Sequence, residues 1–297
     1  PIGSRGLGDV YKRQVLDLAQ WGAGLGENLD WLEPPPKPLL QEGQQQLKQL
    51  KLLTDQGQIT AIGQQVAAFG MHPRLGLMLI EARRWGLEAL ACDLAALLSE
   101  RDIPGSRDFG CDIGHRLQLL RDTTRSDRHD GLGSMRQQSR QWQKQLRSLK
   151  PPAAQLPMND PEDLAIARLI ATAFPEWIAL ARPGQAGAFL LRQGRGAVLA
   201  TSDPLSNAEA LAIARLDLKE RDARIRLAVP ISRNFLNNIA SEQGEWREDV
   251  TWNEKQQGIR AERVLRLGAI ELQRQQLPRP SADLVSQALL QRLRDHG

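Results

Sequence analysis

The apolar positions between residues 39 and 70 recur every three or four residues, a period that predicts helices. The first helix is indicated by leucines at helical spacing, Leu39, Leu40, Leu47, Leu50 and Leu53. A polar turn at 54–60 with short apolar flanks predicts a small hairpin. Thr60 is placed to cap a further helix, because a hydroxyl accepts from the free N–H groups at a helix start. Helix, hairpin and helix predict a winged-helix module over residues 34–74.

The same period continues beyond Pro73 and predicts a helical bundle over residues 75–174. Gly86 separates two helices, and two more are expected over 112–125 and 134–149, the latter polar nearly all round. A fifth helix begins where a cap, a proline and an acid follow one another, at Asp160, Pro161 and Glu162. It ends near Ala173.

After Pro175 the apolar period changes to two, which is typical of strands. Apolar and arginine positions alternate over 223–229, and shorter alternations follow at 246–252 and 270–273. Short strands bounded by Gly and Pro predict a small antiparallel barrel or sandwich over 175–297, with helices near 234–240 and 282–293. The predicted fold class is therefore α+β: a winged helix, a helical bundle and a small β-barrel of the OB type.

The first fourteen residues show no clear periodicity and hold the only tyrosine, Tyr11. We interpret residues 1–14 as a non-native scar and leave them out of the fold prediction. Residues 15–33 are predicted to be the end of a connector that precedes the proline run at 34–36. Its helix is expected to end at Gly22 and Gly24.

Hydrophobic residues make up 41% of the chain and charged residues 25%, the balance of an ordinary globular protein. The two cysteines, Cys92 and Cys111, form no CxxC unit, which favours free thiols in a reducing cytoplasm. No apolar run approaches the roughly 20 residues of a membrane helix, so we expect no membrane partner.

The sequence holds no motif for nucleotide, metal or hydrolytic chemistry. It contains no GxxxxGK[ST] phosphate loop and no Asp-Glu-x-His, its four histidines are scattered, and no nucleophile elbow occurs. We therefore expect no catalytic residue, metal site or cofactor site in this chain. Arg195 lies between Gly194 and Gly196, and this glycine pair favours a turn that connects two strands.

Basic residues gather in one stretch, although the whole chain carries a net charge of only +4. Between His115 and Lys150 there are nine Lys and Arg against three Asp, interleaved with glutamines and Trp142. The stretch is either a solvated helix face or a surface for the backbone of single-stranded RNA, with Trp142 available to stack a base.

Two segments resemble DEAH-box RNA helicases. Trp31 to Pro36, followed by the Leu47–Leu53 helix and the run from Asp55 to Gly63, is similar to their winged helix. The run from Met71 to Leu79 resembles the junction into their ratchet-like bundle. One departure is Lys51-Leu52-Leu53, where the family usually has Gly-Ala-Leu.

The C-terminal part resembles the HrpB branch of this family. The similar segments are Gln193 to Ala197, Asp203 to Leu205, Arg221 to Ala228 and Leu267 to Ala269. The resemblance implies a parent protein that is an ATP-dependent 3′-to-5′ RNA helicase. It also implies two RecA-like domains before Val15, which bind ATP and magnesium, and further chain after Gly297. This chain is then an accessory region that grips RNA, and its partners are single-stranded RNA and the RecA-like domains.

Nine basic residues are candidates for RNA contact. Arg74, at the junction, is equally well explained by packing against an acid, and one of Arg83 and Arg84 is expected to face RNA. Arg224 and Arg226 share one strand face, which is either an RNA surface or a solvated one. Trp246 and Trp252 also share a face and favour a core role over a stacking platform. The full candidate set is Arg74, Arg83, Arg84, Arg136, Arg140, Lys144, Arg195, Arg224 and Arg226.

Two other classes of function fit the same sequence. One is a stand-alone winged-helix protein that binds nucleic acid, such as a regulator. The other is a scaffold whose bundle docks proteins and shows no salt-sensitive affinity for RNA.

Overall fold

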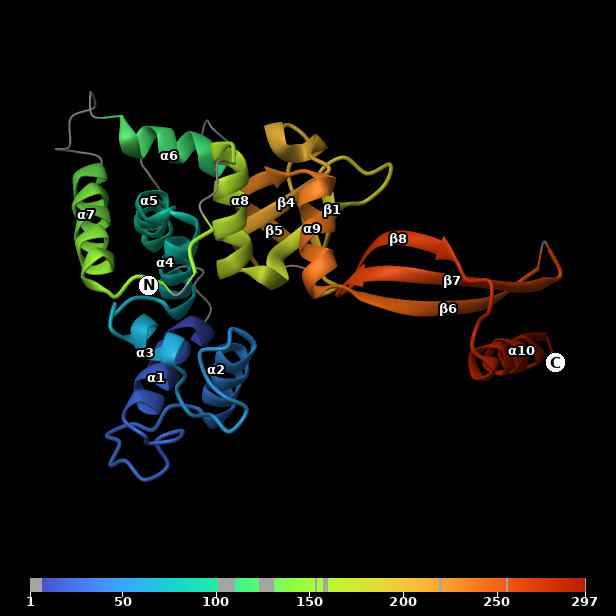
Figure 1. Cartoon of the computed structure of the whole chain (residues 1–297), viewed down its shortest axis with the longest axis horizontal. Coiled ribbons are helices and arrows are strands. Elements are labelled where there is room, and N and C mark those ends of the chain that lie inside the picture. The colour runs from blue at the N-terminus through green and yellow to red at the C-terminus, as the bar shows by residue number, and fades with distance from the viewer. Residues whose placement is uncertain are drawn as a thin grey trace. The chain divides into compact units, whose positions relative to one another are not determined.

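The computed structural model describes residues 7–100, 110–122, 131–152, 154–156, 160–218, 221–254 and 256–296, with side chains from Tyr11 to Arg294. This part of the chain is mixed α and β, with ten α-helices and eight strands (Figure 1). It divides into two compact units. The first comprises residues 1–175 with 212–217 and 225–229, and the second comprises 176–211, 218–224 and 230–297.

The first unit begins with three helices, α1 (Leu7–Gln20), α2 (Lys37–Gln49) and α3 (Ala61–Ala67). As predicted, the Thr60 hydroxyl caps α3 and accepts from the backbone N–H of Gly63 at 3.0 Å. The expected hairpin at 54–60 is reduced to one bridge, between Leu53 and Ile59. Helix α1 begins at Leu7, so part of the segment that the sequence analysis left out is helical.

Five helices follow, α4 (Pro73–Trp85), α5 (Glu88–Ser99), α6 (Ile113–Arg121), α7 (Leu132–Ser148) and α8 (Glu162–Ala173). Helix α5 packs against α4, α6 and α7, and α4 packs against α8 (Figure 1). Gly86 ends α4 in the left-handed conformation, with φ of 71°, as its place between two helical patterns predicts.

Two details of these helices differ from the prediction. Asp160 does not cap α8: the N-cap is Pro161, and the carboxylate of Asp160 pairs instead with Arg168 at 3.4 Å. The helix expected over 112–125 is α6, which ends at Arg121 and has Asp112 as its N-cap. The rest of that expected helix, from residue 123, lies outside the described residues.

Five strands close into a barrel in the order β1-β2-β3-β5-β4. They are β1 (Ile178–Ala181), β2 (Ala188–Leu191), β3 (Gly196–Val198), β4 (Ala210–Asp217) and β5 (Ala223–Ile231). The prediction of a purely antiparallel barrel is wrong for one pair, because β3 runs parallel to β5 with Ala197 opposite Ala223. The sequence pattern could not reveal this, since alternation marks faces and not strand direction.

A second sheet has the order β6-β7-β8, formed by β6 (Glu245–Asn253), β7 (Gly258–Leu267) and β8 (Ile270–Gln276). Helix α9 (Arg233–Gln243) precedes it and α10 (Ala282–His296) follows it (Figure 1). The turn between β7 and β8 docks on the turn between β2 and β3, where the Ala269 N–H donates to the Arg192 carbonyl at 2.9 Å. Strands β1, β4 and β7 were not predicted, and in β7 charged residues interrupt the apolar alternation.

Candidate nucleic-acid interface

Helix α7 presents a basic ridge on the side away from its packed face. Its buried residues recur every three or four positions and are Leu132, Met135, Ser139, Trp142 and Leu146. The exposed face carries Arg140, Lys144 and Arg147, which we call the α7 ridge. Residues 140 and 147 are seven positions apart, so the ridge extends about 10 Å along the helix. A nucleic-acid strand bound along the ridge would contact three cations in one row.

Trp142 does not belong to this surface. Only 6% of the residue is exposed, because it lies on the buried stripe of α7. The prediction that it stacks a base is therefore wrong for this conformation. The same stripe is held by Ser139, whose hydroxyl donates to the Asp93 carboxylate of α5 at 2.6 Å.

The basic residues of α6 and of the start of α7 are tied to the protein. Arg136 donates from Nε to the Leu120 carbonyl at 2.7 Å and from Nη2 to the Asp122 carbonyl at 2.5 Å. Arg121 donates to Asp93 at 3.0 Å and also to Glu162, which joins three helices. Burial lowers the pKa of Arg121, but these two carboxylates outweigh it and the net shift is upward. By contrast, within the described part of the chain no hydrogen bond or ion pair holds the three ridge cations.

Arg74 and Arg83 are buried, with 5% and 7% of the residue exposed. Arg74 donates to the Ala173 carbonyl at 2.9 Å and lies 5.5 Å from the centroid of the Phe174 ring. Arg83 donates to the carbonyls of Leu149, at 3.1 Å, and Lys150. These are packing contacts to backbone carbonyls and, for Arg74, to an aromatic ring. Neither guanidinium is presented to solvent as an RNA contact requires.

Arg84 differs from its neighbour because it points outward. Its guanidinium pairs with Glu81 on the same helix at 3.1 Å, and about half of its side chain is exposed. Of the two adjacent arginines, Arg84 is thus the one whose position is open to a ligand. An exposed pair of this kind adds little stability, so its cation stays available for exchange with a phosphate.

The barrel candidates fall into two groups. Arg224 and Arg226 are exposed on alternate positions of β5, as the alternation predicted, and Arg226 pairs with Asp217 at 3.3 Å. Arg195 lies in the predicted turn between β2 and β3, and it donates to the carbonyls of Leu218 at 3.0 Å and Arg221 at 3.2 Å. Arg195 therefore ties one loop to another.

Arg247, Arg260, Arg266 and Arg274 of the β6-β7-β8 sheet are paired with acids. Arg274 donates to Asp249 at 3.1 Å, to Glu262 at 2.9 Å and to Glu271 at 2.5 Å. Hydrogen bonds to Glu271 and Glu262 raise the pKa of Arg274. Because each of these acids would compete with a phosphate, this face of the sheet is a poor RNA surface.

Trp246 and Trp252 are not core residues, contrary to the favoured prediction. Trp246 is 44% exposed, and the Arg263 guanidinium lies 4.9 Å from its ring centroid. Trp252 is half-buried, with the Arg292 guanidinium 3.8 Å from its centroid. Both rings lie under arginines, which leaves neither one open as a stacking platform on that face.

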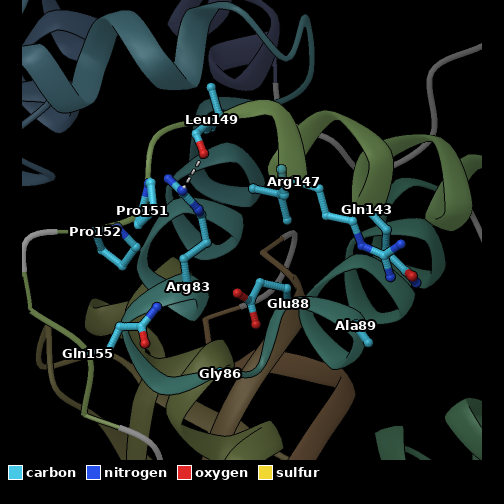
Figure 2. Close-up of a pocket in the computed structure, with 11 residues that line it drawn as sticks. Arg83, Gly86, Glu88, Ala89, Gln143, Arg147, Leu149, Pro151, Pro152 and Gln155 are labelled. Atoms are coloured by element: carbon cyan, nitrogen blue, oxygen red, sulfur yellow. Dashed lines mark hydrogen bonds between the residues drawn. The ribbon is translucent and has the colours of Figure 1, made fainter.

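An open pocket of about 390 Å³ lies between the start of α5 and the end of α7 (Figure 2). Arg83, Glu88, Gln143 and Arg147 contribute its polar side chains together with Gln155. Arg147 belongs to both the pocket and the α7 ridge, so the two features are continuous. Sequence reasoning missed this pocket, because its walls come from segments more than fifty residues apart.

The described ranges hold neither a metal-binding cluster nor a membrane-spanning helix. No group of three or more His, Cys, Asp or Glu side chains there could hold a metal ion. Of the helices described, none is both long enough and apolar enough to cross a membrane.

Comparison with known proteins gives one consistent group of relatives. The family model described as "ATP-dependent RNA helicase HrpB, connector region" matches residues 243–277. The chain is 31% identical over 286 residues to the ATP-dependent RNA helicase HrpB of Escherichia coli, which covers 95% of the chain and 32% of that relative. It is also 34% identical over 89 residues to the probable ATP-dependent RNA helicase DHR2 of Saccharomyces cerevisiae, covering 30% of the chain and 12% of DHR2.

Solved structures agree with these sequences. A crystal structure of the E. coli DExH-box NTPase HrpB matches 97% of the chain with a TM-score of 0.73 and 31% identity, over 33% of that protein. A second crystal structure, of E. coli DEAH/RHA helicase HrpB, matches with a TM-score of 0.74 and 28% identity over the same shares. The chain thus spans about a third of the length of these relatives.

Sequence and fold together define the class: this is an accessory region from the C-terminal part of a DEAH-box helicase. Within that class, the connector match and the similarity along almost the whole chain make it a C-terminal fragment of the HrpB type.

Proposed function

We propose that this region grips single-stranded RNA for the ATPase core of an HrpB-type helicase. The observation that carries the proposal is the α7 ridge, where three cations stand in a row without an internal counter-ion in the described part of the chain. Phosphates bound there would release condensed counterions, which is the main source of sequence-independent affinity. Arg84 and Arg226 are further exposed cations of the first unit, and Arg224 is an exposed cation of the second unit.

We assign the modules of this region to distinct roles. Residues 34–74 would act as a winged helix that braces the assembly, residues 75–174 as a ratchet-like bundle, and the barrel as an OB-like clamp. In this proposal Arg74 and Arg83 have a structural role, since both are buried and donate hydrogen bonds to backbone carbonyls. The helicase would move 3′ to 5′ along the RNA strand, as the family resemblance implies.

Nucleotide chemistry is assigned to RecA-like domains of the whole helicase. The sequence of this chain holds no phosphate loop and no Asp-Glu-x-His, the groups that hold ATP and magnesium in such domains. The chain by itself is therefore expected to hydrolyse no ATP. Clear magnesium-dependent ATPase activity of the purified chain would contradict this assignment.

The test of RNA gripping is the salt dependence of binding. Affinity of the 297-residue chain for a 15-nucleotide oligouridylate is measured by filter binding between 50 and 300 mM salt. The slope of log affinity against log salt should fall by about 2 in magnitude when Arg140, Lys144 and Arg147 are all changed to Gln, at roughly 0.7 per phosphate contact. Both proteins must keep the same circular dichroism spectrum.

A matched control removes three exposed cations elsewhere, by changing Lys37, Arg279 and Arg294 to Gln. This variant has the same net charge as the ridge variant and should keep the slope of the unchanged chain. Equal slopes for the two variants would overturn the role of the α7 ridge. Binding of the unchanged chain that does not respond to salt would overturn RNA gripping itself and favour a protein-docking scaffold.

A further inference from the structure

The pocket at the end of the α7 ridge has the composition of a site for a flat polar ligand. Figure 2 shows Glu88 near its centre, Arg83 reaching to the Leu149 carbonyl, and Pro151 and Pro152 on one wall with Gln155 beside them. Its volume of about 390 Å³ lies within the range of small-molecule sites. Apolar walls with a few convergent polar groups are the usual composition of such sites.

The proline wall is fixed before any ligand arrives. Arg83 donates to the carbonyls of Leu149 and Lys150, which directly precede Pro151. Further along, the N–H of Leu156 donates to the Arg84 carbonyl at 2.6 Å. Hydrogen bonds therefore anchor this segment on both sides, and proline itself restricts the backbone. A preformed wall lowers the entropic cost of binding.

Glu88 supplies the recognition chemistry. Within the described part of the chain, its carboxylate has no hydrogen bond or ion pair. An ionised carboxylate accepts but does not donate, and its two oxygens suit a pair of parallel N–H groups. On the Watson–Crick edge of a nucleobase, guanine presents such a pair, N1–H with the N2 amino group, whereas uracil presents one N–H.

We propose that this pocket receives one unstacked guanine base of an RNA strand that lies along the α7 ridge. Glu88 accepts from N1–H and the N2 amino group, and the base lies against the proline wall. Arg147 lines the pocket and ends the ridge, so it is placed to hold the phosphate of the inserted nucleotide. Unstacked bases read on their Watson–Crick edges are the common basis of single-strand RNA specificity. This inference rests on the proposed RNA function and adds a base preference to it.

The test removes the N2 amino group from the base in the RNA and, separately, the carboxylate of Glu88 from the protein. Two decanucleotides of uridine are compared, one with a central guanosine and one with a central inosine, which lacks the N2 amino group. The 297-residue chain should bind the guanosine strand about tenfold more tightly than the inosine strand. This factor corresponds to the free energy of one hydrogen bond to a charged group. In Glu88→Gln the two affinities should agree within about twofold.

Glu242→Gln is the control, because Glu242 is exposed on α9 and its change also removes one negative charge. It should keep the tenfold preference. Salt-sensitive binding with equal affinity for both strands in the unchanged chain would overturn the guanine site while leaving RNA gripping intact. The same result is expected if the pocket takes a protein side chain. Loss of salt-sensitive binding altogether would instead remove the proposed function itself.

Discussion

The guanidinium of Arg292, on α10, lies 3.8 Å from the centroid of the Trp252 ring, on β6. A second contact lies at the start of the same helix, where the Ser281 N–H donates to the Glu248 carboxylate at 3.1 Å. Residues 252 and 248 are four positions apart on one strand, so they lie on one face of the sheet. These two contacts hold α10 along β6.

Arg292→Ala should loosen α10 without unfolding the chain. A cation–π contact at an exposed site is worth about 0.5–1 kcal/mol, so protection of α10 amides from hydrogen exchange should fall by that amount. Arg294→Ala, two residues on and exposed, is the control and should leave protection unchanged. Equal protection in both variants would show that the stacked ring does not hold the helix.

Arg74→Ala should destabilise the first unit rather than weaken RNA binding directly. The change removes the hydrogen bond from Arg74 to the Ala173 carbonyl and the cation–π contact with the Phe174 ring. We expect a loss of about 2–3 kcal/mol in the free energy of unfolding, measured by urea denaturation. The control Arg84→Ala, on the same helix but exposed, should change it by less than about 0.5 kcal/mol. Weaker RNA binding with unchanged stability would argue for a direct RNA contact by Arg74.

Gly268→Ala should disrupt the joint between the β7–β8 turn and the barrel. A methyl group there would lie 2.3 Å from the Arg192 carbonyl oxygen, at a position with φ of +61°. Gly22→Ala is a matched control, since its φ is +70° and nothing lies within 4 Å of the added carbon. The control should lose only the strain of the left-handed conformation, about 1 kcal/mol. Gly268→Ala should lose at least about 2 kcal/mol more, and equal losses in thermal unfolding would contradict the close packing.

Cys92 should make the stability fall at high pH. Burial raises the pKa of its thiol to about 12 from 9.0, and the charges of Asp93 and Glu88 add to the effect. Between these values the unfolded chain releases a proton that the folded chain keeps. Stability is therefore unaffected below about pH 9 and falls by up to about 1.4 kcal/mol per pH unit above it, until pH 12.

The measurement compares urea unfolding of the chain with that of Cys92→Ala from pH 8 to pH 11. Since other groups titrate in both proteins, only the difference between the two curves reports on Cys92. It should be constant up to about pH 9 and then shrink in favour of Cys92→Ala. A constant difference over the whole range would show that Cys92 is ionised in the folded chain.

Local patterns predicted most of the elements. The Thr60 cap, the helix end at Gly86 and the alternation around Arg224 were all readable because each depends on residues a few positions apart. The buried stripe of α7 was also present in the sequence, at helical spacing from Leu132 to Leu146, although the helix was interpreted as polar nearly all round. Strand β7 was missed because its charged residues hide the two-residue period.

The role of each arginine could not be predicted in the same way. Arg74 meets a carbonyl 99 residues away, and Arg83 meets one 66 residues away. A guanidinium looks the same in the sequence whether it faces solvent or a backbone carbonyl. The periodicity identified polar positions, but the partners of those positions came from segments that only the folded chain brings together.

The sequence by itself determined the α+β composition, most of the helices, several of the strands and the family resemblance, because these follow from local spacing and from motifs. Tertiary structure alone decided which cations remain exposed, the parallel pairing of β3 with β5, and the pocket between α5 and α7. The physical reason is that burial and pairing are properties of distant segments in contact, which local propensity does not encode.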